Sequence, residues 1–218
     1  MALNKDELKE LYRKRAGVYD FSANLYYLIG FREQAYRKKA VAALDLRRGD
    51  TVVEIGCGTG LNFPLLWRAV GPEGEIIGVD LTREMLGKAR VRVQTNGWTN
   101  VELVHGDAAK FPFPPNLAGI ISTFALTLIP EFDAVIRNGC TALAPGGKWV
   151  VLDFRLPSSR AAALFAPLLI FLTRPFGVRK ELAERHPWES IEKCLGNISM
   201  TELYFGFTYI AVGKKATV

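Results

Sequence analysis

The stretch "VVEIGCGTGLN", Val52 to Asn62, decides the fold. It places three glycines within five residues, directly after a run of β-branched residues. A strand that ends in a glycine-rich turn and continues into a helix is typical of an open parallel sheet, whose ligands bind beyond the carboxyl ends of the strands. Glycine allows positive φ and close backbone approach, and the first amides of a helix favour anionic groups. The stretch therefore predicts a ligand-binding turn after the first strand.

Strands and helices are expected to alternate on both sides of this turn. The hydrophobic pattern predicts strands at 51–56, 74–80, 101–107, 117–124 and 148–154, and helices at 61–70, 82–96 and 132–144. Thr82 is expected to cap the helix that begins at Arg83, and "PGG" at 145–147 to end the alanine-rich helix. This alternation implies right-handed βαβ crossovers and a parallel sheet with helices on both faces, the doubly wound α/β class.

Two regions depart from the alternation. Residues 5–46 read as helix, loop and helix, with the interruption at 17–31, and residues 156–197 read as a helical insertion. The closing segment "MTELYFGFTYIAVGKK" suits two strands joined near Gly206. The chain is thus expected to have an N-terminal helical part (1–45), a core (46–155 and 198–218) and an insertion (156–197).

Composition limits the class of protein. With 218 residues and 49% hydrophobic content the chain can bury a core of its own, and its net charge of +6 favours either an anionic partner or an ordinary basic surface. Cys57, Cys140 and Cys194 have no C-x-x-C spacing, which argues against a disulfide framework or a zinc site and for a reducing cytosol. The charged N-terminus does not resemble a secretory signal, and no apolar run is long enough to span a membrane.

The spacing of the glycines disfavours a phosphate ligand. A dinucleotide fingerprint needs glycine at the position of Leu61, whereas the third glycine, Gly60, comes one residue early. A phosphate-binding P-loop needs a lysine followed by Ser or Thr, and "GLN" supplies neither. A tight turn without any ligand remains the plain alternative.

Acidic residues mark three successive predicted strands. Glu54 lies inside the first strand, Asp80 ends the second and Asp107 follows the third. A carboxylate at the end of the second strand can accept hydrogen bonds from both ribose hydroxyls. An acid one strand further along can reach the exocyclic amine of an adenine. Together with the glycine turn, these acids predict a nucleoside site.

The segments "VVEIGCGTG", "GVDLTREMLGKAR", "VHGDAAKFPF" and "LAPGGKWVVLDF" closely resemble the class I S-adenosylmethionine-dependent methyltransferases over residues 36–154. The resemblance implies a seven-stranded sheet with an antiparallel last strand, and S-adenosylmethionine as cofactor. It places Glu54 and the glycines at the methionine, Asp80 and Leu81 at the ribose, Asp107 and Ala108 at the adenine, and Thr123 near the sulfonium. The implied cofactor-binding set is Tyr19, Glu54, Gly56, Cys57, Gly58, Gly60, Asp80, Leu81, Met85, Gly106, Asp107, Ala108, Thr123 and Phe124.

Within that family the chain is most similar to the small bacterial phospholipid N-methyltransferases, including those acting on betaine lipids, and to the quinone-biosynthesis methyltransferases. The similar segments are "YRKRAGVYDF", "STFALTLIPEFDAVI" and "FGFTYIAVGKK". "FALTLIP" stands where the quinone enzymes carry an Arg-Asn-containing segment, which favours the lipid branch. The resemblance places Tyr19 in a lid over the sulfonium, where its hydroxyl could orient an acceptor amine or help to remove its proton, so Tyr19 is the catalytic candidate. No metal is required, and His105 is expected to be structural, with nothing nearby to pair it.

The sequence says less about the methyl acceptor than about the cofactor. Aromatic residues are plentiful and can attract a cationic amine, although most of them must belong to the core. The apolar segment "AAALFAPLLIFL", Ala161 to Leu172, suits either a lipid-facing cap with basic flanks or a helix buried against the sheet or in a dimer interface.

The leading hypothesis is N-methylation of a phospholipid amine such as phosphatidylethanolamine, by a cytoplasmic protein that can touch the inner face of an anionic membrane. The alternatives are C- or O-methylation of a quinone or other hydrophobic small molecule, and a cofactor-binding module without catalysis. Nucleic acid ranks last as a substrate, because no N-P-P-Y-type tetrapeptide follows the fourth strand, where "STFA" stands. The oligomeric state is left open.

Overall fold

The computed structural model describes the chain except residues 1–3, 18, 20–29, 158–184 and 218. The described residues therefore exclude the apolar segment 161–172 and the basic residues that follow it. They also exclude Phe21, Tyr26 and Tyr27, three of the aromatic residues that could attract a cationic amine. The proposed three-part division of the chain stays a prediction.

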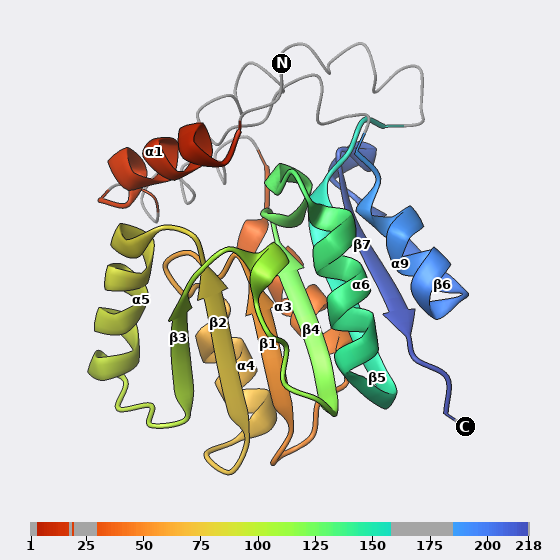
Figure 1. The fold of residues 1–218 in the computed structure, drawn as a ribbon, viewed down its shortest axis with the longest axis horizontal. Helices are drawn as coiled ribbons and strands as arrows, with labels where there is room; N and C mark the ends of the chain where they lie inside the picture. Colours follow the sequence, from red (N-terminus) through yellow and green to blue (C-terminus); the bar gives the residue numbers. More distant parts are fainter. Residues whose placement is uncertain (1–3, 18, 20–29, 158–184, 218) are drawn as a thin grey trace.

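A seven-stranded sheet in the order β3-β2-β1-β4-β5-β7-β6 forms the centre of the molecule (Figure 1). Its strands are β1 (Thr51–Ile55), β2 (Glu75–Asp80), β3 (Val101–His105), β4 (Leu117–Thr123), β5 (Leu143–Phe154), β6 (Ile198–Leu203) and β7 (Thr208–Lys214). The strands β1 to β5 pair in parallel, whereas β7 runs antiparallel to both β5 and β6. The expected doubly wound sheet with an antiparallel last strand is confirmed.

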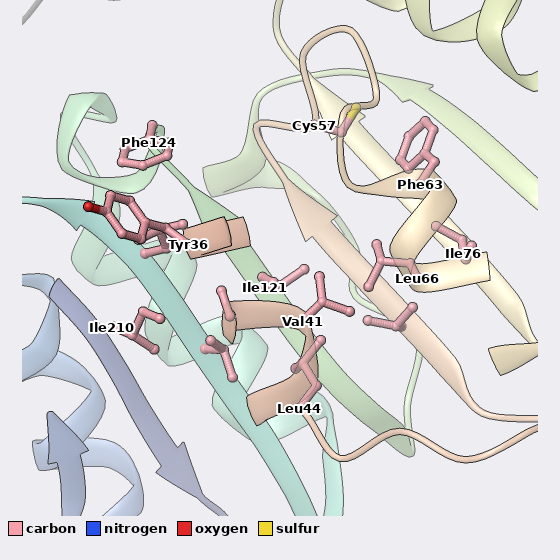
Figure 2. Close-up of a cluster of buried hydrophobic side chains, with 14 of the residues drawn as sticks. Tyr36, Val41, Leu44, Cys57, Phe63, Leu66, Ile76, Ile121, Phe124 and Ile210 are labelled. Carbon is pink, nitrogen blue, oxygen red and sulfur yellow. The ribbon is translucent and has the colours of Figure 1, made fainter. Parts of the chain in front are cut away.

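Helices cover both faces of the sheet. They are α1 (Lys5–Arg15), α3 (Glu33–Ala43), α4 (Phe63–Val70), α5 (Arg83–Thr95), α6 (Phe132–Ala142) and α9 (Pro187–Leu195), with 3-10 turns η2 (Ala108–Lys110), η3 (Leu126–Leu128) and η6 (Tyr204–Gly206). Side chains alternate along each strand, so Val52 packs with α3, α4 and α5 while Val53 packs with α6 and α9. Figure 2 shows the first of these two clusters, in which Val41 and Leu66 meet Ile121.

The two N-terminal helices have different surroundings. Helix α3 belongs to the core layer, because Tyr36, Ala40 and Val41 are buried in the cluster on the first face of the sheet. Helix α1 instead lies across the carboxyl ends of the strands (Figure 1). None of the helices within the described ranges has the length and apolar content needed to cross a membrane.

Two local predictions were wrong. Helix α6 ends at Ala142, so "PGG" lies inside β5. A Cβ on Gly147 would lie 2.7 Å from the carbonyl oxygen of Leu117, which shows that this glycine serves the close approach of two strands. Thr82 holds the N-cap position of α5, but its side chain makes no cap bond. The side chain and the backbone N–H of Thr82 instead both donate hydrogen bonds to the carboxylate of Asp80, the N–H to Oδ1 at 2.8 Å.

Candidate functional site

A cavity of about 900 Å³, including the open solvent at its mouth, lies at the carboxyl ends of β1 to β4. The turns after these strands form its floor, and α1 contributes one wall. Among the residues predicted from sequence, those that line the cavity are Tyr19, Gly56, Cys57, Gly58, Asp80, Leu81, Met85, Gly106, Asp107, Ala108, Thr123 and Phe124. Glu54 and Gly60 do not line it.

The glycine turn forms a cradle that a larger residue would fill. Gly56, Gly58 and Gly60 have φ of 67°, 55° and 76°, the left-handed region that favours glycine. A Cβ on Gly56 would lie 2.4 Å from the Cβ of Ala125. A Cβ on Gly60 would lie 2.5 Å from the ring of Phe63, so Gly60 shapes the turn by packing against the core rather than by facing the cavity.

Asp80 ties the first two turns together. Its Oδ2 accepts the N–H of Gly58 and its Oδ1 accepts the N–H of Thr82, each at 2.8 Å. Burial raises the pKa of Asp80, and the two amides only partly oppose that shift. The side chain of Thr82 donates a third hydrogen bond, so the carboxylate is fixed in position and about one of its four lone-pair sites is left for a ligand.

His105 has partners, contrary to the expectation from sequence. Its Nε2 lies 3.1 Å from the carbonyl oxygen of Leu81, and Arg83 Nε donates to its Nδ1 at 3.4 Å. These contacts fit a neutral imidazole with the proton on Nε2. Because β2 and β3 pair Asp80 with His105, tertiary contact supplied partners that linear spacing did not show.

A buried polar network stands behind the glycine turn. Asn62 Nδ2 donates to Glu54 Oε1 at 2.6 Å and to Thr123 Oγ1 at 2.9 Å, while Arg37 Nη1 donates to Asn62 Oδ1 and to Thr123 Oγ1. Arg37 also forms an ion pair with Glu33 at 2.7 Å. The network thus links β1, β4 and the helices α3 and α4.

Glu54 is the unusual member of this network. It is 1% exposed, and among the described residues its Oε2 has no hydrogen-bond partner. Burial raises the pKa of Glu54 to about 8, although the charge of Arg37 and the hydrogen bond from Asn62 oppose the shift. A carboxyl oxygen left without a partner in the described part of the chain, together with the cavity-lining guanidinium of Arg37, fits the polar end of an amino acid bound nearby.

The end of β4 gives the cavity an aromatic wall. Phe124 has a φ of 56°, and its ring centroid lies 5.3 Å from the guanidinium carbon of Arg37 and 4.9 Å from the ring of Phe154. The rings of Tyr12 and Tyr19 have their centroids 6.1 Å apart, and both residues line the same cavity. Burial raises the pKa of Tyr12 well above its ordinary value, so its hydroxyl stays protonated.

Sequence reasoning missed several lining residues. Helix α1 contributes Lys5, Leu8, Lys9 and Tyr12, and α3 contributes Arg37. No motif marks these residues, because their place at the cavity depends on how the helices pack. Asn62 does not line the cavity but belongs to the buried network behind it. It could have been found from sequence, since it follows the glycines at the start of α4.

The fold and this site together define a nucleoside-binding protein of the Rossmann-like class, with a glycine cradle after β1 and carboxylates after β2 and β3. In the part of the chain that the structure describes, no group of three or more His, Cys, Asp or Glu residues could hold a metal ion. Comparison with known proteins narrows the class.

The profile of the methyltransferase domain matches residues 52–147. Demethylmenaquinone methyltransferase of Anoxybacillus flavithermus is 34% identical over 128 residues, which are 58% of this chain and 54% of that protein. The same enzyme of Bacillus cytotoxicus is 30% identical over 161 residues, 72% of this chain and 67% of that protein. The chain thus spans about half the length of the first of these relatives.

A solved structure shares the fold. Phosphoethanolamine N-methyltransferase 2 of Haemonchus contortus, in complex with phosphomonomethylethanolamine and S-adenosylhomocysteine, aligns with a TM-score of 0.61 at 16% identity, covering 82% of this chain and 52% of that one. The chain belongs to the class I S-adenosylmethionine-dependent methyltransferases. S-adenosylmethionine is the cofactor of this family, and the cradle, the strand-end carboxylates and the unpartnered Glu54 oxygen fit it.

Proposed function

We propose that this protein transfers a methyl group from S-adenosylmethionine to the amine head group of an amphiphilic lipid such as phosphatidylethanolamine. The observation that carries the proposal is the aromatic lining of the cavity, to which Phe124 at the end of β4, Tyr12 on α1 and Tyr19 contribute. Aromatic faces attract an amine that becomes cationic as it is methylated. They do not supply a strong base.

The cofactor end of the cavity has residues suited to each part of the molecule. Gly56 and Gly58 would receive the methionine portion, with the guanidinium of Arg37 nearby for its carboxylate. Asp80 would accept from the ribose and Asp107 from the adenine amine, as the family resemblance implies. When bound, the cofactor supplies an electrophilic methyl group on a cationic sulfur.

The chemistry of the acceptor favours an amine. An alkyl amine is protonated at neutral pH and must first lose a proton, for which solvent is the acceptor. The neutral amine then carries its own lone pair, so the protein needs mainly to align it with the methyl group and to exclude water during transfer. Among the described cavity-lining residues, the carboxylates are Asp80 and Asp107, and both already accept hydrogen bonds from other groups. Tyr19 is the residue proposed to orient the amine through its hydroxyl.

A quinone or phenolic acceptor is the second candidate. It is favoured by the relatives named above, which are demethylmenaquinone methyltransferases. The aromatic wall could then stack on the ring of the acceptor. Methylation of a ring carbon or oxygen needs a base that removes a proton from the acceptor. The carboxylates in the described cavity wall already accept hydrogen bonds from other groups, which supports this step less well than the alignment of an amine. The match to the methyltransferase domain covers residues 52–147, which include the turns expected to bind the cofactor.

The experiment incubates the purified full chain with methyl-labelled S-adenosylmethionine and one of three acceptors: vesicles containing phosphatidylethanolamine, a demethylated quinol, or none. Label in the lipid amine supports the proposal. Label only in the quinol overturns it in favour of the second candidate. Binding of S-adenosylhomocysteine without labelled product in any arm would indicate a cofactor-binding module.

Tyr19→Phe tests the proposed orienting role. Loss of the hydroxyl should lower kcat about 100-fold, the lower end of the range for general acid–base groups, while S-adenosylhomocysteine affinity is retained. Tyr204→Phe is the matched control, since Tyr204 lies outside the cavity lining. Equal kcat values for wild type and Tyr19→Phe would exclude the hydroxyl from the reaction.

A further inference from the structure

Helix α1 forms a wall of the cavity, and among the described residues it packs on the rest of the molecule through a small apolar cluster. Leu8 is buried against Leu128, with Tyr12 beside them, in a cluster separate from the two large cores on the sheet. Lys5, Leu8 and Tyr12 all line the cavity. In Figure 1 this helix lies over the ends of β2 and β3, next to α5. A bound cofactor would therefore contact a helix whose apolar cluster with the described part of the chain is small.

An ion bridge at the start of α1 supplements this contact. Lys5 Nζ lies 2.6 Å from Asp107 Oδ2 and 2.9 Å from Glu131 Oε1. Burial lowers the pKa of Lys5, but the hydrogen bonds to the two carboxylates outweigh burial and the net pKa is raised. Burial raises the pKa of Asp107, and the hydrogen bond from Lys5 with other contacts brings it below the ordinary value. Both partners are thus charged at neutral pH.

The bridge uses the carboxylate expected to bind adenine. Asp107 Oδ1 accepts the N–H of Ala109 at 3.0 Å, and Oδ2 accepts from Lys5. A carboxylate has about four lone-pair sites, so Asp107 can still accept a hydrogen bond from an amine. An exposed ion pair contributes little to folding by itself. Its place at the cavity gives this one a second role.

We propose that Lys5 is a cofactor-positioning residue, which holds Asp107 ready for the adenine amine and couples closure of α1 to occupancy of the adenine end. This inference rests on the proposed function for the location of the adenine. Lys5 and the amine share one carboxylate, so each favours the orientation that the other needs. With the bridge closed, α1 slows the release of the cofactor.

The test measures the dissociation rate of S-adenosylhomocysteine from the full chain by stopped-flow fluorescence. Lys5→Met should raise the dissociation rate by about tenfold, as expected for loss of a charged contact at a partly buried site. Lys5→Arg keeps the charge, so its dissociation rate should stay close to that of wild type. Lys14→Met is the matched control, because Lys14 lies on the same helix, 69% exposed, and pairs with Glu10. It should leave the rate unchanged.

A second ligand separates coupling from simple loosening of the helix. In the analogue of S-adenosylhomocysteine with hydrogen in place of the adenine amino group, no amine reaches Asp107. The effect of Lys5→Met should then shrink to about twofold or less. Equal effects on both ligands would overturn the coupling, as would a Lys5→Met variant that binds S-adenosylhomocysteine as tightly as wild type or more tightly. Failure of wild type to bind S-adenosylhomocysteine would instead refute the proposed function.

Discussion

Replacing Glu54 by Gln should change how the stability of the protein depends on pH. The folded-state pKa of Glu54 is raised by burial from its ordinary value of 4.5 to about 8. Between these two pH values the folded state keeps a proton that the unfolded state has lost, so rising pH favours unfolding. This contribution is fully present below pH 4.5 and is lost as pH rises through 8. Glutamine does not titrate and removes it.

The two pKa values give the size of the effect. One pKa unit corresponds to about 1.4 kcal/mol, so between pH 5 and pH 7 Glu54 lowers the free energy of unfolding by roughly 2–3 kcal/mol. The side-chain amide oxygen that Glu54→Gln introduces can take the place of Oε1 and accept from Asn62. The NH₂ group of the introduced glutamine would occupy the position of Oε2, which has no partner among the described residues. The resulting cost in free energy of unfolding does not change with pH.

The assay is urea unfolding followed by tryptophan fluorescence at pH 5, 6 and 7. The free energy of unfolding of Glu54→Gln minus that of wild type should increase by roughly 2–3 kcal/mol from pH 5 to pH 7. Glu75→Gln is the control, because Glu75 is exposed at the start of β2. Parallel pH profiles for wild type and Glu54→Gln would refute the reasoning and show that Arg37 keeps Glu54 ionised at neutral pH.

Two further changes test the cradle and the network behind it. Gly56→Ala puts a Cβ 2.4 Å from that of Ala125 at a φ of 67°, and should cost about 1–3 kcal/mol of stability and weaken S-adenosylhomocysteine binding in calorimetry. Gly87→Ala, in α5 with nothing within 4 Å of the added atom, should instead stabilise by about 0.5–1 kcal/mol, and a similar loss at both glycines would contradict the cradle. Arg37→Gln should cost about 3–5 kcal/mol in urea unfolding because it leaves Glu33 without its partner. Glu33→Gln added to that variant should recover part of the loss, and no recovery would show that the ion pair is not the cause.

The sheet and the cradle were predictable because their signals are local. Strand periodicity, the glycines after β1 and the strand-end position of Asp80 all arise within a few residues of the chain. Parallel strands that end at one edge must bring their turns together, so the order of the motifs already implied a shared cavity. The same local reasoning misplaced the end of α6, because "PGG" reads as a helix stop until Leu117 is seen beside Gly147.

The sequence by itself determined the fold class, the glycine turn and the carboxylates at the strand ends, since these depend on backbone geometry and hydrophobic periodicity. Tertiary structure decided which side chains meet at the cavity. Lys5 reaches Asp107 across 102 positions of sequence, and Arg37 reaches Thr123 across 86. It also decided that Glu54 lies buried behind the turn. Burial and long-range pairing are properties of the packed molecule, and desolvation, which raises the pKa of Glu54, arises when helices close over the sheet.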